Sequence, residues 1–590
     1  MDQENPHDNE PDALDQPTPE SDPTEAGGPE SLSDAAPESN DYLREPDDDL
    51  ESGGIEAQPG PAPELQPNLA ETLPVREETI ELPQNLRVLI RIGLVLLALL
   101  ALSAHISLAW LHSGDRFGID HTAATWIALS QHAGEGMLYP PLYDEESGQF
   151  GGTRHMPIGI LLNAFGAKLT GEYFRSAKII SEANMALMVL VMLMALLRMR
   201  CSVYCALGLI GAMLMTVPAL QATTSVRCDA LPLALQLMAI LLFVPKRHQN
   251  VDSRSVISGP RVCLAAFLCT LAFFSKLSAV WALISIGIWL LSHHPRRFLT
   301  FMGYSLGMIL VGAAGLNLMT DGRFVENVFA LAFVGVESPE AFFLSPARVL
   351  YQLLEYAPAS WTFLPLAALS LMLAITRQRL SIVHLSLLAS LLVLLVVLAD
   401  RGAGENHLLD FIVLIALCAG DLWRWAANGR RTLGFAQAAM AILLIWSITS
   451  GLIIHVRRDL AEAAMTAFEA RGVTRYDLDP FHGTVNDEMN VLSEDASVEI
   501  ARGKLPVVLD PWMLPIMARN HPDWIEALAG RIERGEFDRI ILLRRLYSES
   551  TWYRDHHFGL RIAEAIEANY TFLEQHGDYF LYAPNGMDSE

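Results

Sequence analysis

The first 85 residues almost lack basic and aromatic side chains. They hold 24 Asp and Glu residues against two bases, Arg44 and Arg76. This leader carries −22 of the formal net charge of −26, so the low isoelectric point describes the leader and not the rest of the chain. A segment this polar cannot bury enough apolar surface to offset its ordering entropy. We therefore predict that residues 1–85 are a disordered acidic cytoplasmic tail.

The leader also lacks the basic start and early apolar run of a secretory signal, so none is expected there. The part of the chain after it is close to neutral, which argues against nucleic-acid binding. Cysteine is scarce, with no CxxC pair and none after residue 455. A disulfide framework or zinc site is not indicated, no cofactor is expected, and a divalent metal requirement stays open. The six cysteines are Cys201, Cys205, Cys228, Cys263, Cys269 and Cys418.

Long apolar runs separated by short polar connections fill residues 86–455. A helix needs about 20 apolar residues to cross about 30 Å of hydrocarbon. The pattern predicts an all-α polytopic membrane domain with about 11 transmembrane helices. The expected spans are 86–111, 176–198, 202–220, 230–245, 262–276, 277–292, 298–319, 357–376, 380–399, 408–423 and 433–455. The apolar piece 156–170 is shorter and contains Lys168, so it is expected to be interfacial or re-entrant.

The basic residues of the connections predict the orientation. Arg87 and Arg91 lie at the start of the first span, and every second connection after it is basic. By the positive-inside rule the amino terminus is cytoplasmic and the carboxy terminus extracytoplasmic, in a multi-pass protein of the cytoplasmic membrane. The segments expected outside are the long loop 112–175, then 221–229, a turn near Lys276, 320–356, 400–407 and 456–590.

Residues 456–590 change in character and predict a small extracytoplasmic α/β domain. "PVVLD" at 506–510 and "RIILL" at 539–543 have the pattern of short buried strands. The stretch "DWIEALAGRIERGEFD" between them has apolar residues at helical spacing.

Polar residues at the edges of spans are costly and are candidates for function. Here they gather on the predicted outer side. A carboxylate there can accept a proton from an acceptor hydroxyl, while cations stabilise a phosphate leaving group. The candidates are Asp120 as the catalytic residue, and Arg154, His155, Arg227, Asp229, Lys276, Glu405, Asn406 and His407 as substrate-binding residues.

From residue 86 onward the chain resembles the GT-C glycosyltransferase superfamily. The resemblance rests on one span followed by a long outer loop with an early Asp, and on "TRHMPIGILLNAFGAKLTGEYFRSAKIIS", "SVRCDALPLAL", "FFSKLSAVWAL" and "GAGENHLLDF" in that order. The bacterial members with similar segments are related to protein mannosyltransferases and lipid A aminoarabinose transferases. The resemblance implies transfer of a sugar from a polyprenyl-phosphate donor to a glycan, lipid or protein acceptor outside the membrane.

The resemblance also implies roles for single residues. Asp120 matches the loop carboxylate proposed as the general base, and Arg154 and His155 fall near the lipid-phosphate site. The family often has Asp-Glu where this chain has Asp120-His121. This departure leaves the acid–base details and any metal requirement open.

Each candidate also has a structural alternative. Asp120 fits the N-cap of a helix, and Arg154 and His155 fit interfacial anchors. Arg227 and Asp229 could pair with each other, and Lys276 needs either a function or a buried partner. Turn formation by glycine and asparagine accounts for much of the segment around 404–407. For the whole chain, the alternative function is a multi-span transporter or a flippase of lipid-linked glycans, but no repeat relates the two halves.

Overall fold

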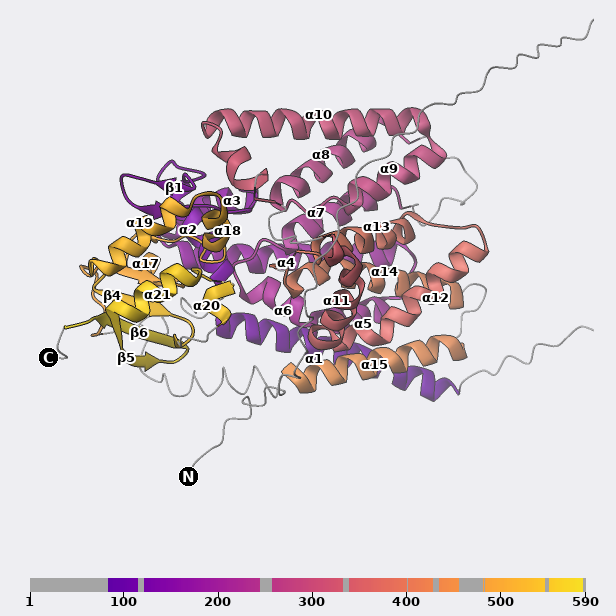
Figure 1. Ribbon diagram of the computed structural model, residues 1–590. Helices are drawn as coiled ribbons and strands as arrows, with labels where there is room; N and C mark the ends of the chain where they lie inside the picture. Colours follow the sequence, from indigo (N-terminus) through magenta and orange to yellow (C-terminus); the bar gives the residue numbers. More distant parts are fainter. Residues whose placement is uncertain are drawn as a thin grey trace, which may run out of the picture. The chain divides into compact units, whose positions relative to one another are not determined.

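The computed structural model describes residues 83–114, 121–244, 257–329, 331–332, 339–400, 402–427, 434–455, 481, 483–546, 551–555 and 557–586. Nearly all of the acidic leader, Asp120 and the segment 456–480 lie outside these ranges. Residues from Glu77 onward form one compact unit. Its long helices gather in a bundle, and the larger sheet lies at one end of that bundle (Figure 1).

The bundle is built from helices that follow the apolar runs of the sequence. They are α1 (Gln84–His112), α4 (Tyr173–Arg198), α5 (Val203–Leu214), α6 (Val217–Thr224), α7 (Ala230–Leu241), α8 (Gly259–Ser275), α9 (Trp281–His293), α10 (Pro295–Met319), α11 (Glu340–Tyr356), α12 (Phe363–Thr376), α13 (Ile382–Val397), α14 (Leu408–Ala427) and α15 (Phe435–His455). Short π and 3-10 turns join them at η1 (Val325–Phe329), η2 (Pro358–Thr362) and η3 (Glu405–His407).

Each of the eleven expected spans coincides with one of these helices or with a pair of them. Among the described residues, five helices are long and apolar enough to cross a membrane, or six if α5 and α6, bent by 75°, form one span. Helices α7, α8, α9 and α13 are apolar but shorter. The helical membrane fold is therefore confirmed, and the count of eleven spans stays a prediction. Helix α11, inside the expected outer loop 320–356, was not predicted.

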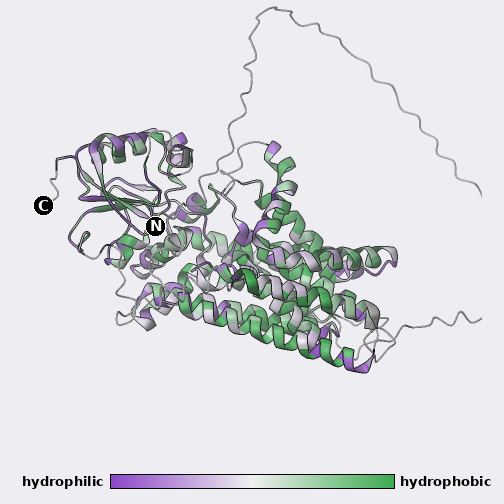
Figure 2. Cartoon of the chain, turned by 90° about the horizontal axis from the view of Figure 1, so that it is seen from below, coloured by the Kyte–Doolittle hydropathy of each residue, from purple (hydrophilic) through white to green (hydrophobic). Residues whose placement is uncertain are grey.

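Burial separates the centre of the bundle from its lipid-facing rim. Every residue of α14 from Phe411 to Trp423 is buried, because the helix packs against α4, α5, α12 and α13. Helix α10 lies along the edge of the bundle (Figure 1) and buries only Phe301 and Ser305. Its apolar residues Leu310, Val311 and Leu318 are exposed. The long helices of the bundle are coloured mostly hydrophobic in Figure 2, as expected for helices whose solvent is lipid.

The long outer loop folds into helices and a small hairpin. It contains α2 (His121–Gly134), β1 (Tyr143–Asp144), β2 (Gln149–Phe150) and α3 (Pro157–Thr170), which Gly171 ends at a φ of 79°. Phe150 forms a parallel bridge with Val508: its N–H donates to Val507 at 2.8 Å, and its carbonyl accepts from Leu509 at 2.9 Å. Residues 506–510 were expected to be a short buried strand. Residues 506–509 are buried, but Val508 alone forms a bridge, and its partner is in the outer loop.

The sheet after residue 490 has four strands in the order β3-β4-β6-β5. β3 (Val491–Ser493) and β4 (Arg539–Leu542) are parallel, whereas β6 (Tyr579–Pro584) is antiparallel to β4 and to β5 (Tyr570–His576). The expected strand at 539–543 and the helix before it are present. The described helices of this part are α17 (Ser497–Ala501), α18 (Leu514–Asn520), α19 (Pro522–Glu533), α20 (Thr551–Asp555) and α21 (Leu560–Asn569). Helix α19 buries Ile525, Leu528, Ala529 and Ile532, the positions its spacing predicts.

Candidate functional site

One cavity of about 980 Å³ brings the predicted site residues together. All eight predicted substrate-binding residues line it, although they come from four connections up to 253 positions apart. Each of the six segments expected outside contributes at least one lining residue. Among the described residues, none from a segment expected inside does so. The connections predicted to share one side of the membrane therefore meet at one place.

The residues around the cavity include three sets of different chemistry. The charged wall is Arg154, Arg227, Asp229, Lys276, Asp400 and Glu405. The apolar wall is Ile284 of α9 with Leu392, Val393, Val396 and Val397 of α13. The aromatic wall is Asp510, Trp512, Trp552 and His557. Two further histidines, His155 and His407, lie beside the charged wall.

Asp229 and Lys276 form an ion pair in the charged wall. Asp229 immediately precedes α7, and Lys276 immediately follows α8, so the packing of these two helices brings the side chains together. The Lys276 Nζ lies 2.6 Å from the Asp229 carboxylate, which also accepts from the Asn406 amide at 3.2 Å. Lys276 therefore has the buried partner that its position required. Asp229 was expected either to line the cavity or to pair with Arg227; it lines the cavity and forms its ion pair with Lys276.

Arg154 and Asp400 form a second ion pair. Arg154 belongs to the long outer loop, and Asp400 follows α13 directly. The other carboxylate oxygen of Asp400 accepts from the backbone N–H of Gly402 at 2.7 Å. Arg154 is thus fixed in the cavity and does not extend as an interfacial anchor.

The two histidines beside the charged wall are neutral at physiological pH. Burial, with the Arg154 charge beside it, lowers the pKa of His155 to about 3. Burial and the charge of Lys276 hold the pKa of His407 well below its ordinary value. The His155 ring stacks on Trp126 of α2, with 4.6 Å between ring centroids. The histidines can therefore donate or accept hydrogen bonds, but the positive charge of the cavity comes from Arg154, Arg227 and Lys276.

The charge balance of the cavity differs from the expectation of one carboxylate among several cations. The described lining holds three Lys or Arg side chains and four carboxylates, those of Asp229, Asp400, Glu405 and Asp510. The Glu405 carboxylate accepts a hydrogen bond from the amide of Gln221. The sequence did not predict Asp400 or the four residues of the aromatic wall as site residues. Asp400 carried a signal, since it ends an expected span, but the residues beyond 500 are distant in sequence from every span edge.

Asp120, the predicted catalytic carboxylate, lies outside the described residues, so its role stays a prediction. Helix α2 begins at the next residue, and its Thr122 and Trp126 line the cavity. Within the described ranges, no three His, Cys, Asp or Glu side chains gather in a group that could hold a metal ion.

No family model matches the sequence, and no curated protein matches it. Solved structures match in fold. ArnT from Cupriavidus metallidurans in the apo state aligns with a TM-score of 0.51 and 12% identity, over 82% of this chain and 97% of that one. ArnT bound to undecaprenyl phosphate gives a TM-score of 0.48 and 10% identity, over 82% and 98%. The Archaeoglobus fulgidus oligosaccharyltransferase AglB with an inhibitory peptide and a dolichol-phosphate aligns with a TM-score of 0.41 and 11% identity, over 83% of this chain and 75% of that one.

At these identities the likeness establishes the fold alone, and only the apo ArnT structure exceeds a TM-score of 0.5 among these three. The alignment extends over nearly the whole length of ArnT and most of this chain. The chain therefore shares the fold of apo ArnT, which agrees with the resemblance of its sequence.

Proposed function

We propose that this protein is a membrane glycosyltransferase that transfers a sugar from a polyprenyl-phosphate donor to an extracytoplasmic glycan, lipid or protein acceptor. The observation that carries the proposal is the cavity, in which three Lys and Arg side chains and an apolar wall line one space. A lipid-linked phosphate presents the same two chemistries, an anion and a hydrocarbon chain. The fold shared with ArnT agrees with the proposed transferase function.

The charged wall supports binding of the donor's phosphate. Arg154 and Lys276 each use one N–H in the ion pairs described above, whereas a guanidinium carries five donors and an ammonium three. The two groups therefore retain donors that a phosphate oxygen can accept. Arg227 adds a third cation from the connection before α7. Hydrogen bonds between charged partners are the stronger kind, and they favour a leaving group that gains negative charge.

The apolar wall supports binding of the polyprenyl chain. Leu392 and Val396 lie one turn apart on α13 and are 56% and 42% exposed. They line the cavity with Val393, Val397 and Ile284. An exposed apolar strip that leads from a charged cavity along a membrane helix suits a ligand with a phosphate head and an isoprenoid tail.

The reaction needs a base for the acceptor hydroxyl. Burial raises the pKa of Asp229, but the charge of Lys276 outweighs this effect and lowers the pKa, which makes Asp229 a weak base. The carboxylate of Asp400 is paired with Arg154. Asp120 directly precedes α2 and remains the carboxylate we assign to this role. Its oxygen takes the hydroxyl proton while the acceptor oxygen bonds to the anomeric carbon. The bond from that carbon to the phosphate oxygen breaks, and the polyprenyl phosphate departs with the electron pair.

The orientation follows from the positive-inside pattern. With the amino terminus cytoplasmic, the six segments around the cavity face the outside of the cytoplasmic membrane. Lipid-linked sugars that face outward supply their own leaving group, so the reaction requires no nucleotide sugar on that side.

Purified protein incubated with radiolabelled polyprenyl-phosphate sugars and membrane extract tests the proposal. Transfer of label to an acceptor, lost in Asp120→Asn, is the expected result. Label that stays on the polyprenyl phosphate but crosses the bilayer of a reconstituted vesicle would indicate a flippase instead. Binding of the sugar lipid without either outcome would also contradict the proposal.

A further inference from the structure

The aromatic wall comes from a part of the chain that the proposed mechanism does not use. Asp510, Trp512, Trp552 and His557 all follow residue 500, yet they line the same cavity as the charged wall. The bridge between Phe150 and Val508 holds the backbone before Asp510 against the outer loop. The hydroxyl of Thr125 in α2 donates to the Leu509 carbonyl at 3.1 Å. The backbone that leads into Asp510 and Trp512 is thus held to the outer loop by hydrogen bonds.

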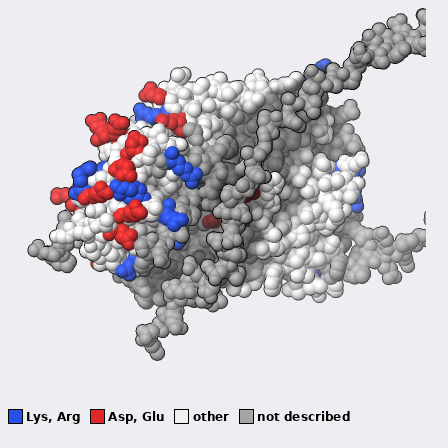
Figure 3. Space-filling view, in the orientation of Figure 1, with Lys and Arg blue, Asp and Glu red and all other residues white. Residues whose placement is uncertain are grey.

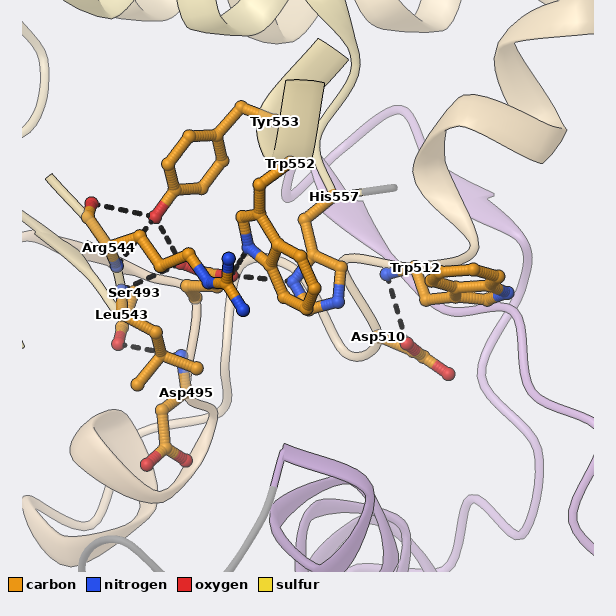
Figure 4. A network of polar contacts seen from close by, with 10 residues as sticks. Ser493, Asp495, Asp510, Trp512, Leu543, Arg544, Trp552, Tyr553 and His557 are labelled. Carbon is orange, nitrogen blue, oxygen red and sulfur yellow. Dashed lines mark hydrogen bonds and ion pairs between the residues drawn. The ribbon is translucent and has the colours of Figure 1, made fainter. Parts of the chain in front are cut away.

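A buried carboxylate orients two residues of this wall (Figure 4). Glu494, 1% exposed, accepts from the Trp552 indole at 3.0 Å and from His557 Nδ1 at 2.6 Å. It also accepts from the Tyr553 hydroxyl and the Leu543 N–H, both at 2.7 Å. Four donors thus converge on one side chain. The indole of Trp552 and the imidazole of His557 therefore have fixed orientations where they reach the cavity.

The position of this network in the sheet is one where ligands commonly bind. Glu494 directly follows β3, and Leu543 directly follows β4. Since β3 and β4 are parallel, their carboxyl ends lie at the same edge of the sheet. Ligands of α/β folds bind in the crevice beyond that edge. Here Trp552 and His557, which bond to Glu494 at that edge, line the cavity.

The rings of the aromatic wall follow one another in space (Figure 4). His557 lies between the two tryptophans, with 4.5 Å between its centroid and that of Trp552 and 6.2 Å to that of Trp512. The Arg544 guanidinium covers the Trp552 ring at 4.0 Å. Asp510 accepts the Trp512 backbone N–H at 3.1 Å, which holds its carboxylate beside the Trp512 ring.

Gly402 connects the aromatic wall to the charged wall. A Cβ at this position would lie 3.0 Å from the Trp512 indole nitrogen and 3.1 Å from a guanidinium nitrogen of Arg154. The indole and the guanidinium therefore both lie close to Gly402. A ligand whose phosphate contacts Arg154 would carry its next group toward Trp512.

We propose that Trp512 and Trp552, with Asp510 and His557, form a carbohydrate subsite that binds one sugar ring at the aromatic wall. Indole faces pack against the C–H face of a sugar ring, and a carboxylate and an imidazole bond to its hydroxyls. The identification of the cavity as a place where sugars are transferred rests on the proposed function. The ring belongs either to the donor or to a glycan acceptor, since both carry the same chemistry.

Three titrations of the purified full chain test the subsite. The ligands are undecaprenyl phosphate without sugar, a panel of undecaprenyl-phosphate hexoses and pentoses, and a panel of soluble oligosaccharides. Trp512→Leu and Trp552→Leu should weaken binding of a sugar-bearing ligand by roughly 3- to 10-fold. Binding of undecaprenyl phosphate itself should change less than twofold. A loss confined to the sugar lipids assigns the ring to the donor, and a loss confined to the oligosaccharides assigns it to the acceptor.

Trp524→Leu is the matched control. Trp524 belongs to α19 of the same part of the chain and stacks on His521 with 3.8 Å between centroids, but it does not line the cavity. It should change none of the three affinities. The subsite is wrong if no sugar-bearing ligand binds, if both cavity variants bind sugars as the parent does, or if they lose sugar-free lipid equally. Failure of the parent protein to bind undecaprenyl phosphate would instead contradict the proposed function.

Discussion

The charged wall and the buried network behind the aromatic wall hold their carboxylates in different ways. Asp229 and Asp400 are each paired with a cation from another connection of the bundle. Glu494 is held by His557, Trp552, Tyr553 and a backbone N–H, all from its own part of the chain. An ion pair at a cavity can exchange one anion for another, so it suits a phosphate ligand. A network of directional donors fixes ring positions instead, which suits recognition of shape.

The surface also differs between the bundle and the carboxy-terminal part in how many charged side chains it carries. Figure 3 shows Lys, Arg, Asp and Glu side chains gathered over the carboxy-terminal part, with few on the visible face of the helices. Few charges are expected on the lipid-facing surface of the helices, because charges inside a membrane are costly. The two ways of holding a carboxylate should respond differently to substitution.

Asp120→Asn should lower turnover by a factor on the order of 10² to 10⁴, because the amide cannot accept the acceptor's proton. Binding of undecaprenyl phosphate should stay unchanged. Steady-state transfer assays and lipid titration of the same preparation measure both quantities. If Asp120 only caps α2, Asp120→Asn would be nearly silent, and Asp120→Ala would cost about 1 kcal/mol of stability.

Lys276→Met should destabilise the protein by about 3–5 kcal/mol, because Asp229, 7% exposed, loses its cation. Thermal unfolding followed by circular dichroism measures the change. The double variant Lys276→Met with Asp229→Asn removes the uncompensated charge and should recover most of the loss. A double variant less stable than the single one would show that the pair does not depend on charge.

Arg154→Gln should weaken undecaprenyl phosphate binding roughly 10- to 100-fold by removing a charged donor. Asp400→Asn is its counterpart. This change releases Arg154 from its carboxylate and should leave affinity unchanged or increase it. Titrations at low and high salt distinguish the two variants. Equal losses in both would mean that the pair serves only to hold the loop to α13.

Glu494→Gln should cost about 1–3 kcal/mol of stability, since the amide leaves a buried donor unsatisfied. Burial raises the pKa of Glu494, but the hydrogen bond and charge of His557, with the Leu543 and Trp552 N–H groups, hold it below the ordinary 4.5. A lowered pKa contributes stability that is complete above about pH 4.5 and is lost as pH falls through the native pKa. Unfolding of the parent should therefore show this acid dependence, and Glu494→Gln should not.

Deletion of residues 1–80 should have the smallest effect. The segment is too polar to pack onto the bundle, so membrane insertion and transfer should remain nearly unchanged. Comparing the yield of detergent-extracted protein and its turnover with the parent checks this. A loss of folded protein would assign the leader a structural role.

The bundle and the residues of the charged wall other than Asp400 could be predicted, because the hydrocarbon of a membrane restricts where polar side chains can occur. Apolar runs mark the helices, and a polar residue such as Lys276 between two runs is conspicuous. The partners were harder to predict. The pairing of Asp229 with Lys276 depends on how α7 and α8 pack, which no local pattern contains. Val508 has the pattern of a sheet strand but pairs with Phe150, because alternation and apolarity do not identify the partner strand.

The aromatic wall could not be predicted for a related reason. Trp512 and Trp552 occur in a part of the chain with ordinary soluble composition, where a tryptophan most often belongs to a core. Their place at the cavity depends on contacts of the outer loop with residues more than 300 positions away.

Binding of a polyprenyl phosphate in the cavity can be seen in an experimental structure of the full chain with undecaprenyl phosphate. We expect density for the phosphate within hydrogen-bond distance of Arg154, Arg227 or Lys276. We also expect the isoprenoid chain to lie along Leu392 and Val396. Density for the phosphate elsewhere, with the ion pairs of Arg154 and Lys276 unchanged and the cavity empty, would contradict this expectation.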